Sequence, residues 1–307
     1  MKKIIAAGAL LTCVQMASAA ALLYEPFNYT TPSTLNGQVG PTTGVWSVAS
    51  TNTTAPPINV VASSLSGPTQ LPASSGNMIQ WGAIGSATNG AVDRLAFPRQ
   101  TSGTVYWSML FRVDDLTGAV TGTTGAFVAG FNNTPGSQTS GVITVAGARL
   151  VIRKDSTNSA QYDFGTSVNS NVGTGANPIQ VFDTTGRDVG VTHFLVGSYT
   201  YNTGSATDDV AQLWIDPDPS TFGTDTIPAP SLTSTGADMN GAAGIATFFL
   251  RSNTSAPKQM SADELRVATT WNEVTSTLSS TALPEPTSGL LLIGGIARLM
   301  TRKQRRA

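Results

Sequence analysis

The chain has 307 residues, of which 11% are charged and 40% hydrophobic, and it contains 43 Thr, 30 Ser and 31 Gly. This charge content is far below the roughly 25% of an ordinary soluble domain, and with only four Glu it excludes a coiled coil. No basic stripe exists to neutralise phosphates, which excludes a nucleic-acid-binding protein. Recurring short apolar blocks exclude a disordered chain. The composition is typical of a β protein with many turns.

The net charge of −1 is an average over three unlike parts. Two basic residues open the chain and five lie in its last ten residues, next to apolar runs. The part between contains ten basic residues against 17 acidic ones once Glu285 is set aside. Basic, apolar ends around an acidic body are typical of an exported protein.

The first 19 residues have the three parts of a secretory signal peptide. Lys2 and Lys3 precede an apolar run over residues 4–14, and Ala17 and Ala19 form a small-x-small cleavage site. The run is too short to remain as a membrane anchor. We therefore predict a signal peptide over residues 1–19, with export as its consequence.

Cys13 is the single cysteine, and it lies inside the predicted leader. An exported domain without cysteine is held together by burial of its core alone, which about 250 residues can provide. A lipoprotein with Cys13 as the lipidated residue is the alternative, although Thr12 is a poor fit for the small residue such a site prefers.

The C-terminus combines three features in a fixed order. A proline-flanked acidic motif comes first, formed by Pro284, Glu285 and Pro286. An apolar segment follows, formed by Gly289, Leu290, Leu291, Leu292, Ile293 and Ile296. A basic tail closes the chain, formed by Arg302, Lys303, Arg305 and Arg306. The prolines favour an extended stretch, and the positive charge favours the cytoplasmic side of a membrane.

Together these features over residues 283–307 resemble the PEP-CTERM sorting signal of exopolysaccharide-producing Gram-negative bacteria. The resemblance implies a transmembrane helix, exosortase and the secretion machinery as partners, and transient anchoring in the inner membrane before delivery to the cell surface or extracellular matrix. The segment is short, since the twelve residues from Gly289 to Met300 span roughly 18 Å of a membrane core about 30 Å thick. Arg298 would snorkel toward the cytoplasmic face. A plain C-terminal tail anchor is the alternative.

Residues 22–274 read as one β domain, followed by a Ser/Thr-rich tether over residues 275–282. Alternation of apolar and polar residues is strongest from Thr104 to Val113. Similar blocks occupy residues 58–62, 91–97, 125–131, 141–145, 149–153, 191–199, 210–215, 244–251 and 262–267. Many short strands without a helical period predict an all-β, antiparallel two-sheet jelly-roll sandwich, flanked by the signal peptide and a short apolar C-terminal helix. The absence of a repeat excludes a β-propeller or a β-helix.

Four blocks of this body are similar to the concanavalin A-like (laminin-G-like) sandwich domains of exported bacterial proteins. They are residues 23–29, residues 105–113, residues 193–196 with 213–219, and residues 263–267 with Trp271. The resemblance implies a β-sandwich in which carbohydrate binding is frequent but not universal.

No catalytic residue is predicted. His193 is the only histidine and opens an apolar block, which indicates a strand-start residue at a sheet edge. The mature glutamates Glu25, Glu264 and Glu273 are scattered, so the carboxylate pair of a retaining glycosidase is missing. Asp263 and Glu264 are adjacent and should point to opposite faces of a strand.

Metal and ligand sites have weak support from the sequence. Zinc is excluded because the mature chain has one His and no Cys. Calcium binding by Asp216 and Asp218 is a minor hypothesis. Asp in such a position more often stabilises a turn through hydrogen bonds to the nearby backbone. Trp107 is expected in the core, and Trp214 is expected to face outward or cover an edge.

These observations favour a non-enzymatic surface or extracellular-matrix protein. A component that binds polysaccharide is the first hypothesis, and a structural or adhesive protein without a specific ligand is the second. A glycoside hydrolase is the third, disfavoured by the missing carboxylate pair.

Overall fold

The computed structural model describes residues 21–41, 44–49, 56–82, 92–134, 143, 145–169, 180–239 and 244–277. The predicted signal peptide and the predicted sorting signal, with its apolar helix, lie outside these residues. Within the described part, no helix has the length and apolarity needed to cross a membrane.

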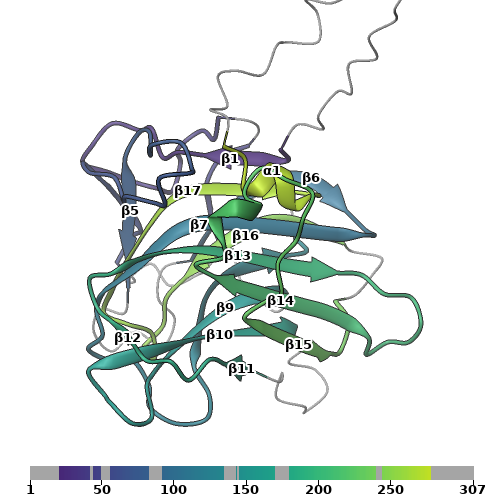
Figure 1. Ribbon diagram of the computed structural model, residues 1–307. Coiled ribbons are helices and arrows are strands. Elements are labelled where there is room, and N and C mark those ends of the chain that lie inside the picture. The colour runs from purple at the N-terminus through teal and green to yellow at the C-terminus, as the bar shows by residue number, and fades with distance from the viewer. Residues whose placement is uncertain are drawn as a thin grey trace, which may run out of the picture.

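Two antiparallel sheets pack face to face, which confirms the predicted β-sandwich (Figure 1). The first sheet has the strand order β15-β14-β13-β7-β17-β5-β4-β2, with β1 paired to β17. Its strands are β1 (Leu23–Glu25), β2 (Ser33–Thr34), β4 (Asn59–Val61), β5 (Met78–Trp81), β7 (Thr104–Asp115), β13 (Thr192–Thr200), β14 (Asp209–Ile215), β15 (Leu232–Gly236) and β17 (Gln259–Ala268).

The second sheet has the order β11-β10-β9-β8-β16-β6-β3, with β12 paired to β10. Its strands are β3 (Ser47–Val48), β6 (Val92–Gln100), β8 (Ala126–Asn132), β9 (Ala146–Lys154), β10 (Gln161–Asn169), β11 (Val181–Phe182), β12 (Arg187–Asp188) and β16 (Ile245–Arg251). The alternating blocks predicted from sequence match β4, β6, β7, β8, β9, β13, β14, β16 and β17. Strands β1, β2, β3, β5, β10, β11, β12 and β15 were not predicted, and the described residues Ile143 and Val145 of the predicted block 141–145 lie outside strands.

The main core lies between the two sheets, because every second residue of each long strand points inward. Trp107 is 1% exposed and packs against Phe248 of the opposite sheet, with ring centroids 5.8 Å apart. Its indole Nε1 donates a hydrogen bond of 3.1 Å to the carbonyl of Ala148. The predicted core position of Trp107 is therefore confirmed, and its side chain links the two sheets.

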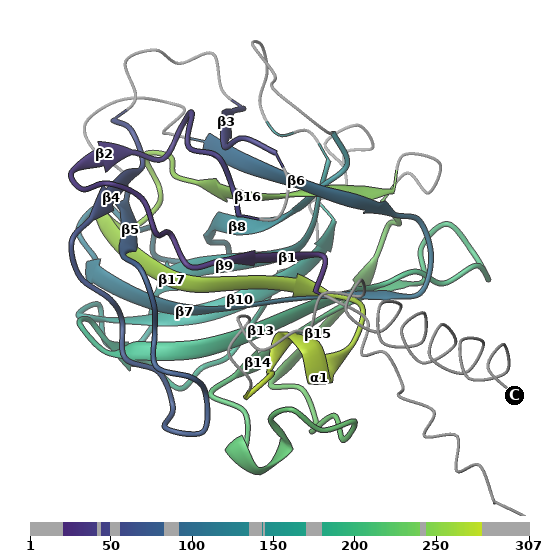
Figure 2. The same ribbon diagram turned by 90° about the horizontal axis from the view of Figure 1, so that it is seen from above.

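A second apolar cluster covers part of the outer face of the first sheet. Helix α1 (Trp271–Val274) and the 3-10 helix η1 (Pro219–Thr221) lie on this side, away from β6 and β16 (Figure 2). Trp271 of α1 packs against Trp214 of β14, with centroids 5.2 Å apart. Trp214 thus points outward as expected, but it is only 2% exposed because α1 covers it.

Candidate functional site

The outer face of the second sheet carries a group of arginines and phenylalanines, which we call the arginine face. Each alternates along its strand with a core residue, so each points away from the core. The arginine face is formed by Arg94, Phe127, Asn132, Arg149, Phe249 and Arg251. They come from four neighbouring strands, β6, β16, β8 and β9, which the sheet topology brings side by side.

Phe127 is the centre of this face. The guanidinium carbon of Arg251 lies 4.0 Å from the centroid of the Phe127 ring, and that of Arg149 lies 4.9 Å from it. Phe249 contacts the same ring edge-on, with centroids 6.0 Å apart. Both guanidiniums are therefore held over an aromatic ring, an arrangement that attracts cations and fixes their position.

The hydrogen bonds that hold Arg149 and Arg251 go to neutral groups. Arg149 donates to the Ser167 hydroxyl at 2.7 Å and to the Asn169 carbonyl at 3.2 Å. Arg251 donates to the Phe127 carbonyl at 3.3 Å. No carboxylate of the described residues forms an ion pair with either arginine.

The sequence excludes a hidden counterion within the sandwich, since the undescribed segments between residues 21 and 277 contain no Asp or Glu.

Both arginines are buried, at 3% exposure for Arg149 and 7% for Arg251. Burial, reinforced by the nearby charge of Arg251, lowers the pKa of Arg149 to about 9. Burial lowers the pKa of Arg251 to about 10. Two desolvated cations without an anion are costly for a fold, and an anion placed beside them would relieve that cost. The arginine face is thus suited to bind a carboxylate, sulfate or phosphate group.

His193 lies at the start of a strand as predicted, but not at a sheet edge. Its strand β13 is flanked by β7 and β14, so it is not at a sheet edge. Its Nδ1 is 2.6 Å from Asp216 Oδ2, and the imidazole packs edge-on against Phe164, with centroids 5.4 Å apart. Its Nε2 is buried and has no hydrogen-bond partner among the described residues.

The calcium candidates Asp216 and Asp218 are each engaged by the protein. Besides His193, Asp216 accepts the backbone N–H of Phe194 at 2.9 Å. Asp218 accepts the N–H of Ser220 at 2.9 Å and caps η1. These contacts account for both carboxylates as local structural groups, and we do not propose calcium there.

The side chains of Glu25 and Glu264 also have structural partners. Glu25 accepts hydrogen bonds from the Phe27 N–H and the Trp46 indole, at 2.7 and 2.9 Å. Asp263 and Glu264 were expected to point to opposite faces of the strand, and they do not follow this simple alternation. The register of β17 shifts between Asp263 and Arg266, and the backbone of Glu264 has a φ of 54°. Both carboxylates accept N–H groups from one segment, Asp263 from Leu65 and Glu264 from Ser75.

Asp208, Asp209 and Asp238 bring three carboxylates within 4.8 Å of one another. Asp238 Oδ1 accepts the backbone N–H groups of both Asp208 and Asp209, and Asp209 accepts the Tyr199 hydroxyl. These bonds account for the cluster as a turn-stabilising arrangement.

Comparisons with known proteins give structural similarity alone. No family model and no curated protein matches the chain. It is similar to an endo-β-1,4-glucuronan lyase from the fungus Trichoderma reesei, with 12% identity and a TM-score of 0.44 over 83% of this chain and 98% of the lyase. It is similar to the alginate lyase Aly36B, with 13% identity and a TM-score of 0.46 over 81% of this chain and 97% of the lyase. A glycosyl hydrolase family protein from Mycobacterium fortuitum matches with 13% identity and a TM-score of 0.38 over 81% and 100%.

The predicted non-enzymatic function is contradicted by these similarities, which are to polysaccharide lyases and a glycosyl hydrolase family protein, and it is withdrawn. Sequence reasoning about catalysis rests on histidines and carboxylate pairs, and both are scarce in this chain. The arginine face consists of arginines that are far apart in sequence and meet only through strand pairing. One signal was available: Arg94, Arg149 and Arg251 each occupy an outward position in an apolar strand.

Proposed function

We propose that this protein is an enzyme that processes an acidic polysaccharide, which it binds across the arginine face. The observation that carries the proposal is the pair of buried guanidiniums of Arg149 and Arg251 over Phe127, with no carboxylate to neutralise them. A uronic acid unit would supply the missing negative charge through charge-assisted hydrogen bonds. Phe127, which is only partly buried, would give the sugar ring an apolar contact.

Elimination is the reaction that this face supports best. Hydrolysis by retaining or inverting glycosidases uses two carboxyl groups beside the scissile bond. Near Arg149, the described outer face carries the carboxylate of Asp163, and this carboxylate already forms an ion pair of 3.0 Å with Arg153. In elimination, water or a basic group takes the proton from the carbon next to the uronate carboxyl, the bond between the adjacent carbon and the glycosidic oxygen breaks as a carbon–carbon double bond forms, and that oxygen takes up a proton from water. Two guanidiniums beside the carboxylate would stabilise the charge that develops in that step.

The test is a panel of purified polysaccharides incubated with the exported body, residues 20–277. Polymannuronate, polyguluronate, polyglucuronate and polygalacturonate are compared with neutral glucan and mannan. New reducing ends report any cleavage, and ultraviolet absorbance of the new double bond reports elimination alone. Cleavage of at least one polyuronate with a rise in absorbance is expected. Absence of cleavage across the whole panel would overturn the proposed enzyme.

Two substitutions connect the activity to the arginine face. Arg149→Met and Arg251→Met keep an unbranched side chain and remove its guanidinium charge, so each should lower affinity for the polyuronate at least tenfold. Arg99→Met is the matched control, since Arg99 is exposed at the end of β6. Affinities unchanged in Arg149→Met and Arg251→Met would show that the substrate lies elsewhere.

We also propose that residues 1–19 direct export and that exosortase reads residues 283–307, which delivers the protein to the cell surface or extracellular matrix after transient anchoring in the inner membrane. The order of the motif with Pro284, the apolar segment and the basic tail supports this proposal. Mass spectrometry of the mature C-terminus tests it. Surface-located protein that still ends in Arg305 and Arg306 would contradict sorting by exosortase.

A further inference from the structure

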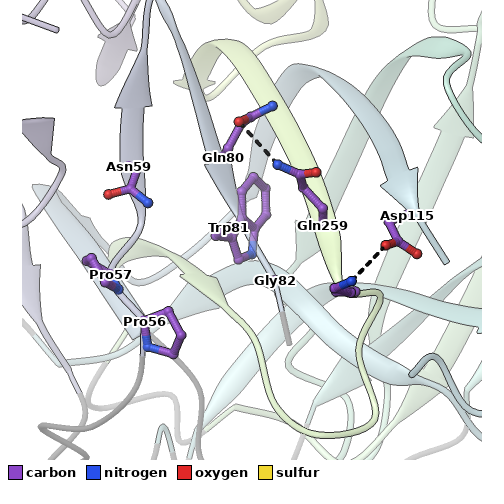
Figure 3. Close-up of a pocket in the computed structure, with 9 residues that line it drawn as sticks. Pro56, Pro57, Asn59, Gln80, Trp81, Gly82, Asp115 and Gln259 are labelled. Atoms are coloured by element: carbon purple, nitrogen blue, oxygen red, sulfur yellow. Dashed lines mark hydrogen bonds and ion pairs between the residues drawn. The ribbon is translucent and has the colours of Figure 1, made fainter. Parts of the chain in front are cut away.

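A pocket of about 260 Å³ lies at the β4–β5–β17 end of the first sheet, apart from the arginine face (Figure 3). We call it the carboxamide pocket, because Asn59, Gln80 and Gln259 supply its side-chain amides. Pro56 and Pro57 border it on the opposite side from Gln259 and Asp115, as Figure 3 shows.

Strand register places these polar groups in one row. Asn59 of β4 pairs with Gln80 of β5, Gln80 pairs with Ser261 of β17, and Ser261 pairs with Arg112 of β7. Core residues lie on the other side of the same strands, among them Val60, Ile79 and Ala262. Four neighbouring strands therefore present a continuous polar row on the outer face of the sheet.

Hydrogen bonds fix the orientation of the central amide. Gln80 Nε2 donates to the Ser261 hydroxyl at 3.2 Å, and Gln259 Nε2 donates to Gln80 Oε1 at 3.2 Å. The Ser261 hydroxyl in turn donates to Asp114 Oδ2 at 2.5 Å. The amide of Gln80 is thus positioned before any ligand arrives, which reduces the entropy that binding has to overcome.

The pocket carries no unbalanced charge among its described residues. Its cation, Lys258, lies 3.5 Å from its anion, Asp115. The backbones of Gly82 and Lys258 approach each other closely beside the pocket, because a Cβ on Gly82 would lie 2.0 Å from the Lys258 carbonyl oxygen. This neutral set of donors and acceptors contrasts with the arginine face.

We infer that the carboxamide pocket binds one neutral, hydroxyl-rich sugar unit. Each amide offers both donors and acceptors, which match the hydroxyl groups of a sugar. The cavity volume is below the roughly 300–1,000 Å³ of sites for drug-sized ligands, which favours a single ring. Trp81 lines the pocket and donates through Nε1 to the Arg251 carbonyl at 3.1 Å, which fixes the pocket relative to the strand that carries Arg251. The site goes beyond the proposed function, because it would recognise a sugar without a carboxylate.

The experiment is a titration of residues 20–277 with neutral oligosaccharides of glucose, mannose and galactose. Calorimetry measures the affinity, and NMR shifts of the side-chain amides report which residues the sugar contacts. Binding of at least one oligosaccharide is expected, and Asn59→Ala and Gln80→Ala should each weaken it at least fivefold. Asn59 is exposed, so its truncation should leave the fold intact even if Gln80→Ala lowers the melting temperature.

Gln70→Ala is the matched control, since Gln70 is an exposed glutamine outside the pocket. Arg149→Met separates this site from the proposed enzyme and should leave neutral-sugar binding unchanged. The inference is overturned if no neutral sugar binds, or if Asn59→Ala binds as tightly as the unsubstituted protein. Neither result decides the outcome of the polyuronate assay, so the two proposals are tested independently.

Discussion

Arg149 occupies a position where a charged side chain opposes folding. It is 3% exposed, and its hydrogen bonds to other described residues go to the neutral Ser167 and Asn169. A residue retained for the fold alone would be replaced at little cost by an apolar side chain of similar length. Its presence beside Arg251 is explained more simply by a ligand that supplies the counter-charge.

Arg149→Met should therefore raise the free energy of unfolding, by about 1–4 kcal/mol, while it weakens polyuronate binding. Urea denaturation of the ligand-free protein measures the first effect. Arg153→Met is the contrasting substitution, because Arg153 is paired with Asp163 and its loss leaves a buried carboxylate alone. That variant should be destabilised. A loss of stability in Arg149→Met equal to that of Arg153→Met would indicate a purely structural arginine.

Strand β13 shows how one element depends on a residue without a side chain. A Cβ on Gly197 would lie 2.2 Å from Cε2 of Trp107, the tryptophan that links the two sheets. Trp107 and Gly197 are directly paired across β7 and β13. The indole therefore occupies the space above the glycine.

Gly197→Ala should lower the free energy of unfolding by about 1–3 kcal/mol, because overpacking forces Trp107 or the backbone to move. Denaturant titration gives this value. In a Trp107→Phe background the smaller ring leaves room for the methyl group, so the same substitution should cost less. Equal costs in the two backgrounds would show that Gly197 is constrained by something other than Trp107.

The elements also show how far the sequence could predict the fold. Alternation predicted β7 well, because its inward and outward residues differ sharply in hydropathy. Strand β10 was missed because its outward positions are Asp163, Gly165 and Ser167, which resemble turn residues. The arginine face was missed for a different reason. Its members meet through pairing between strands that are distant in sequence, and a local pattern does not indicate which distant strands become neighbours.

Across the whole molecule, two buried aspartates make stability depend on pH. Burial raises the pKa of Asp93 to about 7 and that of Asp263 to about 8. In the unfolded chain both titrate near 3.9. Between these values the folded state holds more protons than the unfolded state, so the free energy of unfolding falls as pH rises from about 4 to 8.

Asp263→Asn should flatten this decline, because the amide stays neutral and still accepts the Leu65 N–H. Thermal melts at several pH values between 4 and 8 measure the slope. Asp225→Asn is the control, since Asp225 is exposed and its replacement should leave the slope unchanged. An Asp263→Asn variant with the original slope would contradict the assignment.

The places where the chain enters and leaves the sandwich, near Ala21 and Val274, determine how the protein can be attached to a surface. Ala21 and Val274 both pack against the apolar cluster on the outer face of the first sheet, whereas Arg149 and Arg251 lie on the outer face of the second. The sandwich thus separates both chain ends from the arginine face (Figure 2). A fusion partner or sensor surface attached next to Ala21 or Val274 would lie on the opposite side of the sandwich from the arginine face. Immobilised protein should therefore capture polyuronate with the same affinity in both orientations.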